Sequence, residues 1–204
     1  MQKPYAESCD QNRDVILAVL REILADNKQV LEIGSGTGQH AVYFAKHLAH
    51  LRWHPSDLVS SHAGINMWLE EARLDNVSKP LDIDVASATW PISNVDAIFS
   101  ANAVHIMSWQ HVEKMFDGIG RTLEKDGKLC LYGPFNYNGT YTSESNARFD
   151  IWLKERDPVS GIRDFETLDK LAKKQGLSLL RDYEMPANNR VLVWKRTSTL
   201  PTLK

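Results

Sequence analysis

The residues from Glu32 to Gly38 read EIGSGTG and place an acid two positions before the first of three alternating glycines. Glycine backbones adopt angles closed to other residues and let a ligand approach closely. The apolar spacing that follows predicts a helix, whose N-terminus favours bound polar or negative groups. The spacing G-x-G-x-G differs from the dinucleotide pattern G-x-G-x-x-G, and no Gly-Lys-Ser/Thr ending of a P-loop follows. Glu32 suits a cofactor that presents a cationic amine better than a pyrophosphate.

Polar residues also stand at the ends of later apolar runs, each of which predicts a strand. In a parallel sheet with helical connections, ligands bind beyond the carboxyl ends of the strands. We therefore expect these residues to lie near the glycine turn: Asp57, Asp84, Asn102, His105, Tyr132 and Asn136.

Three of these assignments have an alternative. Asp57 is also placed to cap the helix that follows it. Asp82 can replace Asp84, because both flank a short strand whose end is uncertain by about two residues. His105 is suited to orient a substrate or take a proton near neutral pH, or else to be a buried, hydrogen-bonded histidine.

The elements that must position these residues alternate between strand and helix, which predicts a parallel sheet with helices on both faces, an α/β fold of Rossmann-like type. A helix over 13–25 is expected to begin at an Asn12 cap, and Pro55 is expected to break the second strand. Ser108 is a predicted N-cap, and Gly176 is a predicted helix stop. The expected strands are 29–33, 51–57, 79–85, a run starting at 95, 128–133, 177–185 and 190–196, and the further helices are 38–47, 60–74, 108–123 and 164–176.

Composition narrows the class of protein. The chain has 204 residues, 43% of them hydrophobic, and a net charge of −2, which is typical of one globular domain over 1–204 and gives no basic footprint for nucleic acid. No apolar run is long enough to span a bilayer, and no signal peptide stands at the start. Cys9 and Cys130 fit reduced thiols, so a cytoplasmic location is expected. The histidines lack acids or cysteines at ligand spacing, so no metal site is expected.

Two segments extend the basic fold. Residues 1–27 are expected to form an N-terminal helical cap whose first residues fold over the cofactor. The connection 133–163 is unusually long and rich in aromatic residues, and such loops commonly carry function. We interpret it as a lid, with a helix of its own, that excludes water from the reaction site.

The motif Glu32-Ile33-Gly34-Ser35-Gly36-Thr37-Gly38 resembles the first motif of class I S-adenosylmethionine-dependent methyltransferases. Several longer stretches resemble one little-characterised family of methyltransferase-like proteins, the family that contains methyltransferase-like protein 26. The stretches that carry this resemblance are VLEIGSGTGQHAVYFA, WHPSD, LYGPFNYNGTYTSESNARFD, GIRDFE and EMPANN, and it covers about residues 10 to 196.

The resemblance implies a seven-stranded sheet whose last strand is antiparallel, with S-adenosyl-L-methionine as cofactor. Glu32 would receive the cofactor's amino group, and the glycine backbone would lie under its methionine tail. Asp57 would hold the ribose, Asp84 the adenine amine, and Val85 would pack on the adenine ring.

The expected function is methyl transfer to a small molecule. His105, Tyr132 and Asn136 are candidates to orient or deprotonate the acceptor, and Arg13 is a candidate partner for the cofactor carboxylate. Motifs for methylating nucleic-acid bases are absent, since Ser100-Ala101-Asn102-Ala103 replaces Asn-Pro-Pro-Tyr/Phe. Two alternatives remain: a catalytically silent module that binds cofactor and a protein partner, and a nicotinamide-dependent dehydrogenase. The sequence names neither the acceptor nor the oligomeric state.

Overall fold

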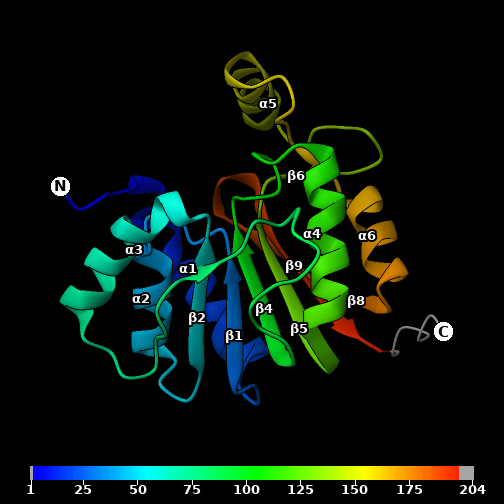
Figure 1. Ribbon diagram of the computed structural model, residues 1–204. Helices are drawn as coiled ribbons and strands as arrows, with labels where there is room; N and C mark the ends of the chain where they lie inside the picture. The colour runs from blue at the N-terminus through cyan, green and yellow to red at the C-terminus, as the bar shows by residue number, and fades with distance from the viewer. Residues whose placement is uncertain (1, 198–204) are drawn as a thin grey trace.

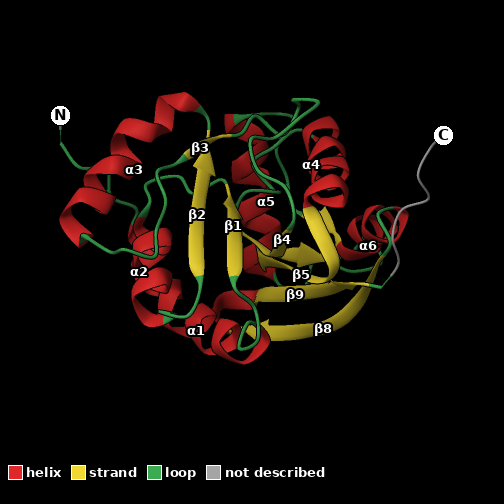
Figure 2. Ribbon diagram, turned by 60° about the horizontal axis from the view of Figure 1, so that its bottom comes forward, coloured by secondary structure: helices red, strands yellow, loops and turns green. Residues whose placement is uncertain are grey.

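The computed structural model describes residues 2–197, and they build one seven-stranded sheet with the strand order β3-β2-β1-β4-β5-β9-β8 (Figures 1 and 2). Strands β1 to β5 are parallel, whereas β9 is antiparallel to both of its neighbours. The predicted fold is therefore confirmed; Met1 and residues 198–204 of the expected domain lie outside the described residues. The strands are β1 (Gln29–Ile33), β2 (Arg52–Asp57), β3 (Leu81–Asp82), β4 (Val95–Ala101), β5 (Leu123–Gly133), β8 (Leu177–Met185) and β9 (Asn189–Arg196), with β6 (Phe135–Asn136) and β7 (Arg163–Asp164) pairing separately.

Helices cover both faces of the sheet, because successive strand residues point to opposite sides. On one face Val30 and Phe99 pack with α1 and α2, and on the other Leu31 and Ile98 pack with α4 and α6. Helix α5 stands apart, above the carboxyl edge of the sheet at the top of Figure 1. The helices are α1 (Glu7–Ile23), α2 (Gln39–His47), α3 (Val59–Ala72), α4 (Trp109–Thr122), α5 (Glu144–Arg156) and α6 (Phe165–Lys174), and a 3-10 turn spans Pro186–Asn188.

Most element boundaries follow the sequence, with two clear corrections. Helix α1 begins at Glu7, so Asn12 is not its cap but a buried residue inside it. Strand β2 runs through Pro55, which the sequence predicted to break it. The amide and carbonyl of Trp53 and the carbonyl of Asp57 bond toward the β3 side, and β3 pairs only with Ser56 and Asp57. The missing N–H of Pro55 therefore falls where no ladder bond is made.

Smaller differences concern the ends of elements. Helix α3 begins at Val59, one residue early, and β5 begins at Leu123 instead of 128. Ser108 is confirmed as the N-cap of α4, since its hydroxyl accepts a hydrogen bond from the amide of His111 at 3.3 Å. Gly176 follows α6 in the left-handed region, as predicted. Within residues 2–197, no helix has the length and apolar character needed to cross a membrane.

The linker between β3 and β4 has no helix and is held against helix α4 by Trp90. A Cβ atom built on Gly118 of α4 would lie only 2.1 Å from the Trp90 ring, so the ring occupies the space above this glycine. The linker carries Ile83, Asp84 and Val85, and this contact therefore helps to fix the residues that follow β3.

We predict that Gly118→Ala lowers the free energy of unfolding by about 1–3 kcal/mol, because the added methyl group overpacks against Trp90. Urea unfolding measures this change. In a Trp90→Ala background the same substitution is expected to lower the free energy of unfolding by much less. A Gly118→Ala protein at least as stable as the parent would contradict the packing that we describe.

Candidate functional site

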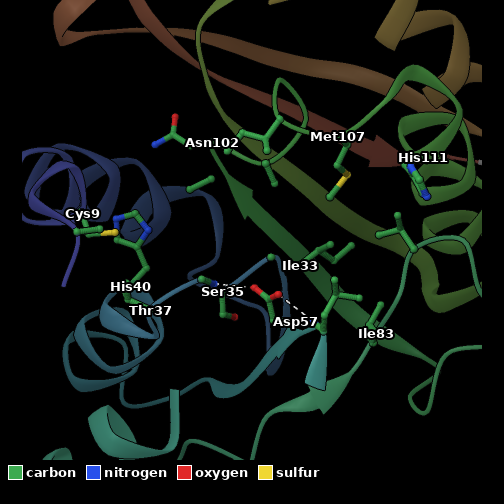
Figure 3. A pocket seen from close by; sticks show the side chains of 18 of the residues that line it. Cys9, Ile33, Ser35, Thr37, His40, Asp57, Ile83, Asn102, Met107 and His111 are labelled. Carbon is green, nitrogen blue, oxygen red and sulfur yellow. Dashed lines mark hydrogen bonds between the residues drawn. The ribbon is translucent and has the colours of Figure 1, made fainter. Parts of the chain in front are cut away.

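A pocket of about 590 Å³ opens at the carboxyl edge of the sheet (Figure 3). Its walls come from the glycine turn, from the ends of β2, β3 and β4, and from the start of α1. The predicted residues that line it are Gly34, Ser35, Gly36, Thr37, Asp57, Asp84, Val85 and Asn102. The remaining candidates, which lie outside the wall, are Glu32, Gly38, Arg13, His105, Tyr132 and Asn136.

The glycine turn is fixed by backbone bonds between β1 and β2. The amides of Gly34 and Ser35 donate to the carbonyl of Ser56 at 3.0 and 2.9 Å. A Cβ atom on Gly34 would lie 3.2 Å from the Cβ of Ala103, whereas one on Gly36 would meet nothing within 4 Å. Gly36 has a φ of 57° and borders the open pocket, so its backbone is available for close approach by a ligand.

Asp57 joins this turn to the start of α3. Its Oδ2 accepts a hydrogen bond from the amide of Gly36 at 2.8 Å. Its Oδ1 accepts hydrogen bonds from the amide of Leu58 at 2.8 Å and the hydroxyl of Ser61 at 3.0 Å. The carboxylate therefore contacts the beginning of the helix and also lines the pocket, but Asp57 is not the N-cap that the sequence offered as an alternative, because that position is Leu58. Its role toward a ribose stays a prediction.

The end of β3 forms an apolar wall with one exposed acid. Asp84 lines the pocket and Asp82 does not, which favours Asp84 between the two alternatives. Its Oδ1 accepts a hydrogen bond from the amide of Ala86 at 2.8 Å. Ile83 and Val85 on either side are buried, and Figure 3 shows Ile83 on the same side of the pocket as Met107 and His111.

Glu32 lies beneath the glycine turn rather than in the pocket wall. Its side chain is only 2% exposed, and the indole Nε1 of Trp53 donates to its Oε2 at 2.9 Å. Burial raises the pKa of Glu32 to about 7, against hydrogen bonds from Trp53 and Ser35 that lower it. Its role toward a cofactor amine stays a prediction.

The start of the chain forms part of the pocket wall; its role as a cap over a cofactor stays a prediction. We call residues 3–12 the strap; within it Ala6, Ser8 and Cys9 line the pocket. The Oε1 of Gln39 accepts a hydrogen bond from the Ala6 amide at 2.6 Å, and this holds the strap to the first turn of α2.

A second attachment ties the strap to α3. The indole Nε1 of Trp68 donates to the carbonyl of Pro4 at 2.8 Å, and the ammonium of Lys3 lies 3.8 Å from the centre of the Trp68 ring. Gly64 leaves room for Pro4, because a Cβ there would lie 2.6 Å from its Cγ.

His40 is a pocket residue that sequence reasoning did not select. Its Nε2 lies 2.7 Å from the Oδ1 of Asn12, and burial lowers its pKa to about 4, so the imidazole is neutral. Burial also raises the pKa of the neighbouring Cys9 thiol to about 11. The available signal was the position of His40, two residues after Gly38 on the first turn of the helix.

The three acceptor candidates lie behind the wall. His105 is 3% exposed, its Nδ1 has no hydrogen-bond partner, and burial followed by the charge of Arg163 lowers its pKa to about 4. Asn136 likewise has a buried Oδ1 without a partner. Tyr132 is buried on the α1 side, where its hydroxyl bonds Asn12, so it does not reach the pocket.

None of the residues of the segment 133–163 belongs to the wall of the pocket. Its role as a lid stays a prediction. The end of the segment instead supports the loop after β4: Gly161 N donates to the carbonyl of His105 at 2.8 Å, and the Ser160 hydroxyl to that of Ile106 at 2.8 Å. Arg163 adds a bond from its Nε to the carbonyl of Val104 at 3.1 Å.

Arg13 also lies away from the wall. One of its guanidinium nitrogens pairs with Asp10 at 2.5 Å, and the group stacks on the ring of Tyr43. Over the part of the chain that the structure describes, no group of three His, Cys, Asp or Glu side chains is placed to hold a metal ion.

Comparison with known protein families shows to which family the chain belongs. Residues 3–196 match the family described as protein of unknown function, DUF938. The chain belongs to the DUF938 family. The match includes the strap, the glycine turn and the segment 133–163, so all parts of this site fall within the family region.

The DUF938 chain is also similar to methyltransferases. It is 28% identical over 146 residues to phosphoethanolamine N-methyltransferase from Plasmodium falciparum (isolate 3D7), covering 69% of this chain and 52% of that protein. An O-methyltransferase family protein from Burkholderia thailandensis matches with a TM-score of 0.76 at 12% identity, over 91% of this chain and 58% of its own. The YcgJ protein from Bacillus subtilis matches with a TM-score of 0.72 at 14% identity, and the match covers 91% of this chain and 99% of the YcgJ chain. The chain spans about half the length of the curated relative, and the structural likenesses confirm the fold alone.

We predict that Glu32→Gln stabilises the protein at about pH 8 but not at about pH 5. A carboxyl whose pKa is higher in the folded protein keeps its proton on folding, so the free energy of unfolding falls as pH rises from 4.5 through about 7. The full loss is on the order of 3 kcal/mol. The amide oxygen of glutamine can still accept the Trp53 hydrogen bond.

Urea unfolding of variant and parent at both pH values measures the effect. Glu124→Gln is the matched control, since Glu124 is exposed and its variant should follow the parent at both pH values. If the free energy of unfolding of Glu32→Gln differed from that of the parent by the same amount at both pH values, this would argue against a protonated Glu32.

Proposed function

We propose that this DUF938 protein is an S-adenosylmethionine-dependent methyltransferase that acts on a small-molecule acceptor. The observation that carries the proposal is the glycine turn, whose middle residue borders an open pocket between Asp57 and Asp84. The volume of the pocket is in the range of small-ligand sites. The methyltransferase fold and the methyltransferase relative support the proposal.

The residues present fit this cofactor. The space beside Gly36, which a Cβ atom would begin to fill, suits the methionine tail, and the Oδ2 of Asp57, which accepts one bond from Gly36, can accept a second from a ribose hydroxyl. Asp84 would accept from the adenine amine while Ile83 and Val85 contact the ring. When bound, the cofactor supplies a methyl group activated by a positively charged sulfur.

The protein's own part is mainly to position and to exclude water, which suffices for much of the rate enhancement in group transfer. Residues of the strap and of the supported loop 102–107 both contribute to the pocket wall. A silent module that binds cofactor and a protein partner remains the second candidate, favoured by the fact that His40 and His105 are buried and held neutral. Release of methyl groups to acceptors separates the two candidates.

Further elements of the proposal rest on sequence. They are the closer relationship to the family of methyltransferase-like protein 26, a cytoplasmic location and the absence of a nucleic-acid partner, which a net charge of −2 favours. A nicotinamide dehydrogenase is disfavoured by Glu32 and by the spacing of the glycines.

We predict that S-adenosylhomocysteine binds the protein in isothermal titration calorimetry, and that Asp84→Ala weakens this binding about tenfold or more while Asp82→Ala does not. Loss of a hydrogen bond to a charged group costs about 1.5–3 kcal/mol. Asp82 is the matched control, because it is an exposed acid two residues away and outside the wall. No saturable heat at high micromolar ligand would refute the proposed cofactor.

We predict that Asp57→Ala weakens the same binding more than Asp57→Asn does. Asparagine keeps one oxygen for the bond from Gly36, whereas alanine loses both the fixed turn and the ribose partner. Unfolding curves of both variants control for loss of the α3 contacts. Unchanged affinity in both variants would remove the role assigned to Asp57.

A further inference from the structure

The wall of the pocket is poor in positive charge. Among the residues that line it, the formally charged side chains are Asp57 and Asp84, and there is neither lysine nor arginine. His40 is neutral because burial lowers its pKa to about 4. His111 stands at the other end of the pocket from Cys9 and His40 and is hydrogen-bonded to Ser108 at 2.7 Å (Figure 3).

Arginines elsewhere in the described chain that the fold brings toward this edge are already engaged. Arg163 donates to the carbonyls of Val104 and Val159. Arg190 pairs with Asp182 at 2.8 Å and with Glu184 at 3.0 Å. An acceptor bearing phosphate or carboxylate would therefore be desolvated beside two acids without a cationic partner, which is costly.

A cationic acceptor is disfavoured as well. Under the proposed function, on which this inference rests, Asp57 and Asp84 serve the cofactor, and the transferred methyl group sits on a positively charged sulfur. An ammonium group beside it in a desolvated pocket would be repelled. An acceptor without net charge has neither cost.

The part of the site that the cofactor assignments leave free is apolar, with one amide side chain at its edge. Ala103, Met107 and Ile106 form this side, and Ile106 is 58% exposed at the pocket. Asn102 lines the pocket beside them, whereas the neighbouring His105 is buried outside the wall. The side-chain oxygen of Asn102 accepts hydrogen bonds, which suits an O–H or S–H donor.

We propose that the methyl acceptor is an uncharged, largely apolar small molecule with a hydroxyl or thiol group, and that anionic acceptors are excluded. In the transfer, a bond forms between the acceptor's oxygen or sulfur and the methyl carbon, the carbon–sulfur bond of the cofactor breaks, and the acceptor's proton leaves to solvent. This acceptor differs in class from the phosphoethanolamine in the name of the curated relative.

The test uses the full chain and two matched pairs of probes: catechol with 3,4-dihydroxybenzoate, and benzyl mercaptan with 4-(mercaptomethyl)benzoate. Calorimetry measures the binding of each probe, and of phosphoethanolamine, to protein loaded with S-adenosylhomocysteine, and product formation from S-adenosylmethionine measures turnover. We expect binding and turnover to favour the uncharged member at least tenfold, and the two pairs distinguish hydroxyl from thiol. Binding or methylation of phosphoethanolamine or of the anionic members equally well would overturn the proposal.

A charge introduced at the wall makes the test independent of finding the natural acceptor. Ile106→Arg should strengthen binding of phosphoethanolamine and the carboxylate probes at least about tenfold, because it supplies the missing cation. Ile151→Arg is the matched control, since Ile151 is also 58% exposed but lies on α5 outside the wall. An Ile106→Arg protein that binds S-adenosylhomocysteine yet gains no affinity for these anions would contradict the inference. Failure to bind S-adenosylhomocysteine in the parent would instead refute the proposed function.

Discussion

The hydrogen bond from the Gly36 amide to the Asp57 carboxylate is the contact on which the geometry of the pocket depends. It joins the ends of β1 and β2, and the same carboxylate also binds the amide of Leu58 at the start of α3. Helix α3 in turn holds the strap through Trp68 and Pro4. The floor of the pocket and one of its walls are thus coupled through one side chain, although they lie far apart in the sequence.

The sequence predicted the sheet, the glycine turn and the acids at the strand ends well, because these depend on local pattern and on a general rule about parallel sheets. It failed where a contact is made between distant segments. Asn12 resembled a cap because its helical partner is adjacent in sequence, but in the structure its partner is His40. Pro55 resembled a strand breaker because the sequence does not show that β3 begins only opposite Ser56, one residue beyond it.

The aromatic residues of 133–163 indicated an ordered segment but not which surface it contacts. The segment donates hydrogen bonds to backbone carbonyls at 104–107. Such bonds cannot be predicted from the residue types at 104–107, because every residue has a backbone carbonyl. The placement of Glu32 below the turn was hidden for a related reason. Its direction is set by the indole of Trp53 on the neighbouring strand, a pairing that only strand register reveals.

The strap gives the two ends of the described chain unequal relations to the pocket. Residues 3–12 run across the pocket wall beside α3, whereas β9 is antiparallel and ends at Arg196, on the opposite edge of the sheet. Polypeptide joined ahead of residue 3 therefore starts next to the pocket, while β9 ends at the edge of the sheet away from it. For purification tags, reporter fusions or immobilisation on a sensor surface, the carboxyl-terminal side is thus the better point of attachment.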